Sequence, residues 1–231
     1  ALKKNINTIS FSKKNSLSDI YIKKIIPQKL NYKIYISNKK IIKSFLIKKN
    51  LYPYLYNILA SVALISEFYD LKNIDEKLFY NFKLPVSRGD MTRVRLKNKG
   101  IYFTDESYNS NPLSLKFAIE NFNNQNSSNK YLILGDMLEL GKFSKILHKK
   151  ISKTINKTSI KKVYVIGKHI KETFYAIDAN KRGKILKNKK EIYHLIKNDL
   201  NNNDHLMIKA SNSTGLNIVA KNLKEGKIYA I

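Results

Sequence analysis

The sequence contains no cysteine, and this absence excludes two ways of stabilising a fold. A disulfide framework needs paired cysteines, and a zinc site of the thiolate type needs cysteine ligands. The four histidines, His148, His169, His194 and His205, lack the close spacing of paired metal ligands, so we predict no metal site in this chain. A chain without thiols also fits a reducing compartment.

Long hydrophobic runs are absent as well. The first residues, ALKKNINTIS, lack the apolar core of a signal peptide. The longest apolar run, YNILASVALI, is too short to cross a bilayer. We therefore expect a cytoplasmic protein that does not insert into membranes.

Arginine is scarce, although the formal net charge is +27. Of the 44 basic residues only four are arginine: Arg88, Arg93, Arg95 and Arg182. Arginine is better suited than lysine to bidentate hydrogen bonds with phosphates and base edges. The lysines are also spread along the whole chain. The pattern favours a solvated lysine-rich surface and no nucleic-acid partner. The alternative, a non-catalytic basic nucleic-acid-binding module, predicts a steep salt dependence of binding.

The first third of the chain has the rhythm of a small sheet followed by helices. Short alternating runs between residues 9 and 49 predict strands of an antiparallel or mixed region. Residues 51–71 then predict a buried helix, and residues 73–83 a second helix with Asn73 as N-cap and Glu76 completing a capping box.

Pro85 and Gly89 break this pattern, and we place a domain boundary here, with domains at 1–84 and 85–231. After the boundary, four-residue apolar runs recur at 131–134, 163–166 and 205–208, each followed by a loop and a helical pattern. Residues 100–107 and a short run near Ile185 are further strand candidates. Such spacing predicts a doubly wound, Rossmann-like α/β domain with a mostly parallel sheet.

Polar residues gather where three of these strands end. After the first strand, DESYNSNP contains Asn111 and Pro112, the expected N-cap and first residue of a helix. LGDMLELG follows the next strand and leads to His148, which we expect at the surface, and KASNS follows the last strand. Carboxyl ends of parallel strands meet at one edge of the sheet, where ligands of such folds bind. The sequence predicts a binding site there.

These stretches resemble the signatures of a known family. DESYNSNP resembles the DDSYNANP signature of the Mur ligases, in particular of those members that add D-alanyl-D-alanine, and LGDMLELG with its downstream histidine resembles the next signature. IKASNSTGL resembles the late KGS-type loop, with Ala210 in place of the usual glycine. SRGD and PYLYN resemble two nucleotide-contacting segments. The resemblance covers residues 50–231.

The resemblance implies an ATP-dependent amide ligase of peptidoglycan synthesis. Its substrates would be a UDP-N-acetylmuramoyl tripeptide and D-Ala-D-Ala, with ATP and Mg²⁺ as cofactors. By resemblance, the nucleotide would be bound by Asn57, Arg88 and Glu106. Asn109, Asn111 and Ser211 would bind the dipeptide or the growing peptide, and no catalytic residue is assigned in this chain.

Several departures from the family pattern bear on activity. Glu106 stands where aspartate is usual, and Pro53 where histidine is common. The chain has no GxxGK[ST] loop to hold the β- and γ-phosphates. We therefore interpret the chain as the C-terminal part of such a ligase, with residues 1–84 the end of a mixed α/β ATPase domain, and expect no ligation by this polypeptide alone. Folylpolyglutamate synthase is the nearest enzyme alternative, since it shares this architecture.

Overall fold

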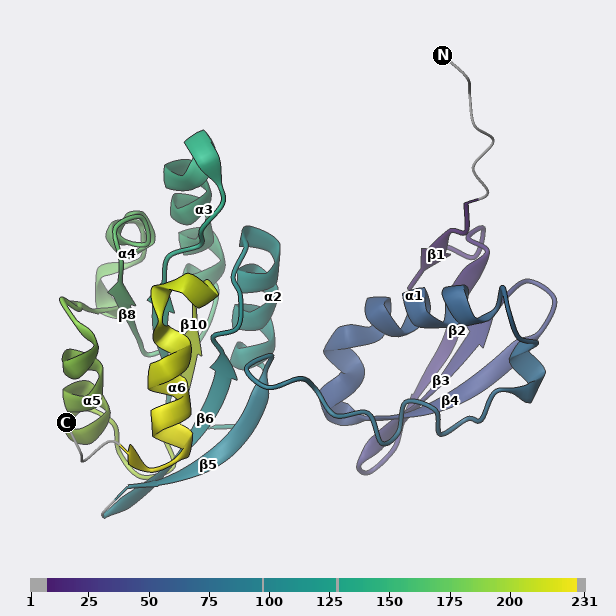
Figure 1. Ribbon diagram of the computed structural model, residues 1–231, viewed down its shortest axis with the longest axis horizontal. Coiled ribbons are helices and arrows are strands. Elements are labelled where there is room, and N and C mark those ends of the chain that lie inside the picture. Colours follow the sequence, from purple (N-terminus) through teal and green to yellow (C-terminus); the bar gives the residue numbers. More distant parts are fainter. Residues whose placement is uncertain (1–7, 97, 128, 228–231) are drawn as a thin grey trace. The chain divides into compact units, whose positions relative to one another are not determined.

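The computed structural model describes residues 8–96, 98–127 and 129–227 (Figure 1). Contacts along the chain divide it into two units, residues 1–83 and 84–231. The four-residue apolar runs of the sequence all lie in the second unit, as expected for strands that are buried on both faces.

The N-terminal unit contains a four-stranded sheet in the order β1-β2-β3-β4. Strand β1 runs parallel to β2, whereas β2, β3 and β4 are antiparallel neighbours. The predicted mixed sheet is therefore confirmed. Its strands are β1 (Phe11–Ser12), β2 (Ile20–Pro27), β3 (Asn31–Ser37) and β4 (Ile42–Lys48).

One α-helix, α1 (Leu55–Ile65), contacts β1 and β2 of this sheet. A 3₁₀ helix, Lys49–Tyr54, leads into it. Its buried residues, Leu55, Ile58, Leu59, Val62 and Ala63, follow the three-to-four spacing of a helix face. The predicted buried helix is confirmed, although it is shorter than the apolar stretch.

The second helix that we predicted for residues 73–83 does not form. Asn73 ends a 3₁₀ helix, Leu71–Asn73, and turns follow it. Glu76 completes no capping box. Its carboxylate accepts a hydrogen bond from Ser44 Oγ (2.8 Å) and pairs with Lys33 Nζ (3.2 Å). Because the Glu76 carboxylate contacts the sheet, it is not available to accept a hydrogen bond in a capping box.

The C-terminal unit contains a six-stranded sheet in the order β5-β6-β10-β7-β8-β9. All neighbours are parallel except β5 and β6, so the predicted α/β fold with a mostly parallel sheet is confirmed. The strands are β5 (Asp90–Leu96), β6 (Lys99–Glu106), β7 (Lys130–Gly135), β8 (Lys162–Ile166), β9 (Arg182–Ile185) and β10 (His205–Lys209).

The edge strand β5 was not predicted. Its sequence, DMTRVRL, carries the alternation of a half-buried strand, since Val94 and Leu96 are buried while Arg93 and Arg95 are exposed. The alternation of polar and apolar residues that is typical of a strand was therefore present in the sequence, directly after Gly89, where we placed the domain boundary.

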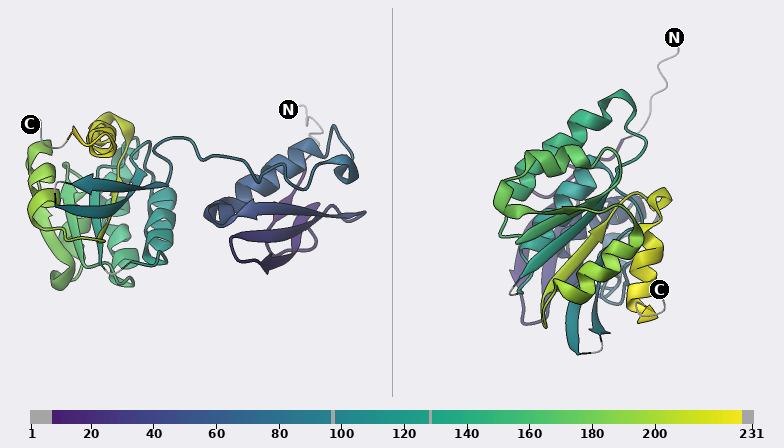
Figure 2. Two further views of the ribbon diagram at one scale, coloured as in Figure 1. Left: turned by 90° about the horizontal axis from the view of Figure 1, so that it is seen from below. Right: turned by 90° about the vertical axis from the view of Figure 1, so that its left-hand side faces the viewer.

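Helices cover both faces of this sheet (Figures 1 and 2). Side chains of α5 and α6 belong to one apolar cluster, and those of α2, α3 and α4 to the other. Along β10, Leu206 and Ile208 join the first cluster and Met207 the second, as expected for a strand buried on both faces. The helices are α2 (Pro112–Asn123), α3 (Ser144–Asn156), α4 (Lys171–Ala176), α5 (Lys189–Asn198) and α6 (Leu216–Lys224).

No helix within the described residues is both long enough and apolar enough to cross a membrane.

Titration of His205 is expected to make the stability of the C-terminal unit depend on pH. His205 is 1% exposed and its Nε2 lies 2.8 Å from Thr104 Oγ1. Burial, with the nearby Lys130 charge, lowers its pKa to about 4. An imidazole whose pKa is depressed by folding stabilises the fold above its unfolded pKa of ~6.5, and this contribution disappears as the pH falls through the folded pKa. We expect a loss on the order of 2–3 kcal/mol between pH 6.5 and pH 4.

The measurement is urea unfolding at a series of pH values. His205→Gln should flatten the curve between pH 6.5 and pH 4, whereas His194→Gln, at an exposed position, should leave it unchanged. An unaltered slope in His205→Gln would contradict this assignment.

Candidate functional site

The three polar loops meet at the carboxyl edge of the sheet, as the sequence predicted. Lys209, the last residue of β10, pairs in register with Glu106 of β6 and with Leu134 of β7, so the three strands end together. The loops enclose a small hollow of about 190 Å³. Its lining residues are Tyr108, Asn109, Leu138, Glu139, Ser211, Asn212 and Ser213.

Asp105 organises this edge and is fully buried, so it does not face the hollow. Its Oδ1 accepts hydrogen bonds from the backbone N–H (3.0 Å) and the Oγ (2.6 Å) of Ser107. Its Oδ2 accepts from Ser87 Oγ (2.9 Å) and pairs with Lys224 Nζ (2.5 Å). A buried carboxylate is stable only with such donors, so these bonds fix the segment before β5 and the loop after β6 against each other.

Lys224 attaches α6 to the same cluster. Its Nζ lies 2.9 Å from Asp90 Oδ2 as well as beside Asp105. Burial lowers the pKa of Lys224, but hydrogen bonds and charge from Asp105 and Asp90 outweigh it, and the net pKa is raised. The lysine therefore stays charged and links α6 to β5 and β6.

Glu106 lies on the same strand and pairs with a buried lysine. Its Oε2 is 3.2 Å from Lys209 Nζ, and the Lys209 side chain is 3% exposed. Lys209 Nζ also donates to the Asn109 carbonyl oxygen (2.9 Å). Burial raises the pKa of Glu106, and the Lys209 charge opposes that rise. Lys209 thus orients the carboxylate that we expect to contact the nucleotide.

Arg88 lies over an aromatic ring of the hollow. Its guanidinium carbon is 4.2 Å from the centroid of the Tyr108 ring, within the range of a cation–π contact. The Tyr108 N–H donates to the Ser87 carbonyl oxygen (3.1 Å), so the backbone holds the two residues close to each other. Sequence reasoning did not identify Tyr108 as a neighbour of Arg88, because twenty residues separate them.

The three residues expected on the peptide side are placed differently. Asn109 and Ser211 both line the hollow. Asn111 does not line it: its Oδ1 accepts from the Ser114 N–H (2.8 Å) and caps α2, which confirms the predicted cap with Pro112 as the first helical residue. Ser211 Oγ donates to the Ser110 carbonyl oxygen (3.2 Å) and accepts from the Leu138 N–H (2.9 Å).

Asn57 belongs to the other unit, on the solvent-exposed side of α1. Its side chain is exposed, and it stands one residue before the buried Ile58. The N-terminal unit therefore presents this amide to solvent, as a contact to a nucleotide would require.

His148 corrects our expectation of a surface histidine, because it is 0% exposed. Its Nε2 accepts a hydrogen bond from the Met137 N–H (2.9 Å), and Nδ1 therefore donates to the Ser144 carbonyl oxygen (2.7 Å). Burial lowers the pKa of this imidazole. The neutral ring connects α3 to the loop after β7.

Asp136 of the same loop has a structural role as well. Its carboxylate accepts from the backbone N–H groups of Lys168 (2.9 Å), His169 (2.9 Å) and Ile170 (2.7 Å). A Cβ at Gly167, where φ is +141°, would lie 2.5 Å from Asp136 Oδ1, so only glycine fits beside this carboxylate.

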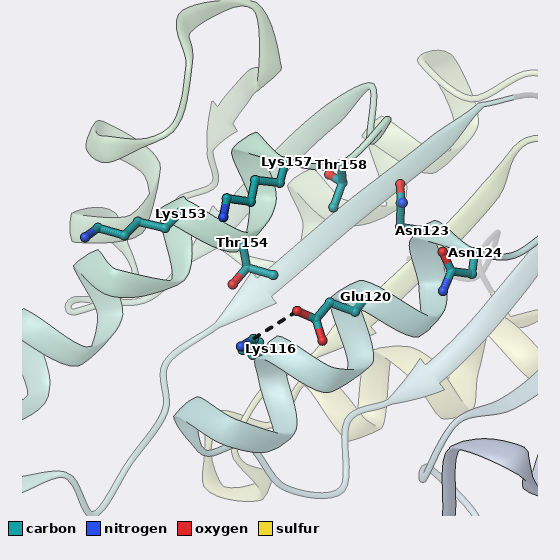
Figure 3. A pocket seen from close by; sticks show the side chains of 8 residues that line it. All are labelled: Lys116, Glu120, Asn123, Asn124, Lys153, Thr154, Lys157 and Thr158. Atoms are coloured by element: carbon teal, nitrogen blue, oxygen red, sulfur yellow. Dashed lines mark ion pairs between the residues drawn. The ribbon is translucent and has the colours of Figure 1, made fainter. Parts of the chain in front are cut away.

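Within the described residues no cluster of three histidine or acidic side chains could hold a metal ion. A larger hollow, of about 520 Å³, lies between the C-terminal ends of α2 and α3 (Figure 3). Lys116, Lys153 and Lys157 line it, and Lys116 Nζ lies 3.9 Å from Glu120. Because β7 and β8 begin after these helix ends, this hollow lies toward the opposite edge of the sheet from the three loops.

Removal of Lys209 is expected to destabilise the C-terminal unit. Lys209→Met would leave the partly buried Glu106 carboxylate, whose side chain is 19% exposed, without its counterion, at a cost of about 2 kcal/mol in the free energy of unfolding. The double variant Lys209→Met/Glu106→Gln should recover much of this loss, since no unpaired charge remains. Urea unfolding at pH 7 measures both, and additive losses in the double variant would contradict the pairing.

Comparison with known proteins agrees with this geometry. Residues 91–212 match the family described as Mur ligase, glutamate ligase domain. The chain is 35% identical over 142 residues to the UDP-N-acetylmuramoyl-tripeptide–D-alanyl-D-alanine ligase of Buchnera aphidicola subsp. Baizongia pistaciae, covering 61% of this chain and 30% of that ligase. The ligase of the same name from Bacillus subtilis is 29% identical over 146 residues, which cover 60% of this chain and 32% of the relative. The chain thus spans about a third of these relatives.

Solved structures share the fold. The MurF ligase from Thermotoga maritima in complex with ADP superimposes with a TM-score of 0.73 at 20% identity, covering 96% of this chain and 49% of that one. MurF from Acinetobacter baumannii gives a TM-score of 0.74 at 18% identity, with coverages of 94% and 46%. Because the matched family domain spans more than half of the chain and contains every residue that lines the hollow except Ser213, the protein belongs to the Mur ligase family.

Proposed function

We propose that this chain is the C-terminal part of an ATP-dependent ligase that joins D-Ala-D-Ala to a UDP-N-acetylmuramoyl tripeptide. The observation that carries the proposal is the hollow formed by the DESYNSNP, GDMLELG and KASNS loops, since these loops contain the signatures of the ligases that add D-alanyl-D-alanine. The Buchnera and Bacillus relatives bear that name. These motifs favour this ligase over folylpolyglutamate synthase. We propose that this ATP-dependent ligation takes place in the cytoplasm.

On the nucleotide side we assign Asn57, Arg88 and Glu106. Arg88 supplies a guanidinium for phosphate oxygens, and the Tyr108 ring below it restricts its position. Glu106 is an acceptor for ribose hydroxyls, with Lys209 holding its Oε2. Asn57 supplies an exposed amide for adenine. ADP in the Thermotoga relative supports a nucleotide as ligand.

On the peptide side we assign Asn109 and Ser211 to direct roles, because both line the hollow. Asn111 acts through the backbone, since its side chain caps α2 and thereby sets where the DESYNSNP loop ends. The hollow is polar, and hydrogen bonds of backbone groups hold the loops around it in place. It would hold a dipeptide in a fixed orientation, which lowers the entropic cost of bringing the amine to the acyl group.

Phosphoryl transfer requires groups outside this chain. Among the described residues no group of three histidine or acidic side chains could hold a metal ion, and the sequence has no GxxGK[ST] loop. We propose that a preceding ATPase half supplies both, and that residues 1–84 are the end of that half. Bound ATP would activate the tripeptide carboxylate as an acyl phosphate, and the residues of this chain would orient the nucleotide and the attacking amine.

The test is to express the protein together with whatever the reading frame encodes upstream of Ala1. The 231-residue chain alone should release no phosphate from ATP, whereas the extended protein should release phosphate only when tripeptide precursor and D-Ala-D-Ala are both present. Phosphate release by the chain alone, or release from the extended protein without D-Ala-D-Ala, would overturn the proposal.

Arg88→Ala in the extended protein should raise the KM for ATP about tenfold, which corresponds to ~1.4 kcal/mol. The matched control is Arg93→Ala, because Arg93 also lies over a tyrosine ring, that of Tyr102 at 5.4 Å, but its partner Asn203 follows α5 and not the three loops. Equal effects of the two substitutions on the KM for ATP would count against the role of Arg88.

A further inference from the structure

Glu139 has an unusual backbone conformation. Its φ is +63°, a region that residues with a Cβ rarely adopt, and its side chain is exposed. Residues held in such conformations persist only where the surroundings fix them, and they cluster at functional sites. Here the surroundings are specific: the neighbouring Leu138 N–H donates to Ser211 Oγ (2.9 Å), and the Ser211 N–H donates to the Asp136 carbonyl oxygen (3.1 Å).

Among the described residues that line the hollow, Glu139 is also the only charged one. The others are neutral: Tyr108, Asn109, Leu138, Ser211, Asn212 and Ser213. Within the described part of the chain no ion pair involves Glu139, although 44 lysines and arginines against 17 acidic residues give the chain a net charge of +27. The wall of the hollow is therefore anionic on a strongly basic protein.

Arg88 lies 4.2 Å from the centroid of the Tyr108 ring, but we assign it to the nucleotide, so Glu139 is the charged group that a ligand in the hollow meets. A ligand with an ammonium group complements this carboxylate, whereas a purely anionic ligand would be repelled by it. Asn109, Asn212 and Ser213 supply neutral hydrogen-bonding groups for the peptide and carboxyl groups of such a ligand.

We propose that Glu139 binds the free α-ammonium group of the incoming dipeptide and makes the hollow selective for an unblocked amine. This inference rests on the proposed function, which supplies the dipeptide. It explains why a glutamate, and not glycine, stands at a position of positive φ: the carboxylate is needed there despite the unfavourable backbone conformation.

The first experiment uses the 231-residue chain and follows backbone amide NMR shifts during titration with D-Ala-D-Ala or N-acetyl-D-Ala-D-Ala. The free dipeptide should shift the amides of Asn109 and Asn212, and acetylation should weaken binding at least tenfold. Glu139→Gln should weaken binding of the free dipeptide about tenfold and remove the discrimination. The control Glu120→Gln, an exposed glutamate on α2, should change neither.

Glu139→Gly provides a second variant that cannot fail through backbone strain, since glycine adopts positive φ readily. It should melt no lower than the unsubstituted chain and should also lose the discrimination. The inference would be overturned if the unsubstituted chain bound both peptides equally or bound neither of them. It would also be overturned if both variants still preferred the free dipeptide to the acetylated one.

A second readout separates this inference from the proposed function. In the extended protein, Glu139→Gln should raise the KM for D-Ala-D-Ala about tenfold and leave the KM for ATP unchanged. Ligation with an unaltered KM for the dipeptide would overturn the role of Glu139 while the proposed function stands. Amine-dependent binding by the chain, together with no ligation by the unsubstituted extended protein, would overturn the proposed function and leave the role of Glu139 intact.

Discussion

The buried carboxylate of Asp105 is the constraint on which the rest of the candidate site depends. An ionised group with no exposure to water is costly unless donors surround it, and Asp105 receives donors from Ser87, Ser107 and Lys224. Those donors belong to the segment before β5, the loop after β6 and helix α6. Satisfying one carboxylate therefore fixes three parts of the fold at the edge where the hollow lies.

The same principle separates the polar residues of the signatures into two groups. Asp105, Asp136 and His148 are buried and make hydrogen bonds within the protein, and Asn111 caps a helix. Others, such as Tyr108, Asn109 and Glu139, line the hollow. A signature of this kind thus encodes a scaffold and a binding surface in the same few residues, and a substitution in either group would affect the site by a different route.

Unfavourable backbone conformations lie beside this surface. Ser87 and Glu139 both have positive φ, at +63°. Ser87 is held by Asp105 and by Asp90 Oδ1, which accepts from its N–H at 2.7 Å, and Glu139 is next to the Leu138–Ser211 hydrogen bond. The cost of each conformation is of order 1–3 kcal/mol, which the surrounding hydrogen bonds offset. These hydrogen bonds therefore hold the backbone at this edge of the sheet in a fixed conformation.

By itself the sequence determined the elements whose signals are local. Continuous apolar runs specified the parallel strands, Asn111 with Pro112 specified the start of α2, and the order of the signatures specified the family. The period of β5 was also present, and a search for alternation next to the boundary would have found it.

Only the tertiary structure decided which polar side chains are buried and which face the hollow. Lys209 and Glu106 form an ion pair although 103 positions separate them in the sequence. Glu76 does not form the predicted capping box and accepts a hydrogen bond from Ser44, 32 positions away. Such partners are brought together by strand order and register, and burial then determines whether a charged side chain must be satisfied internally. No local pattern carries that information, because the free energy of a buried polar group depends on what surrounds it in space.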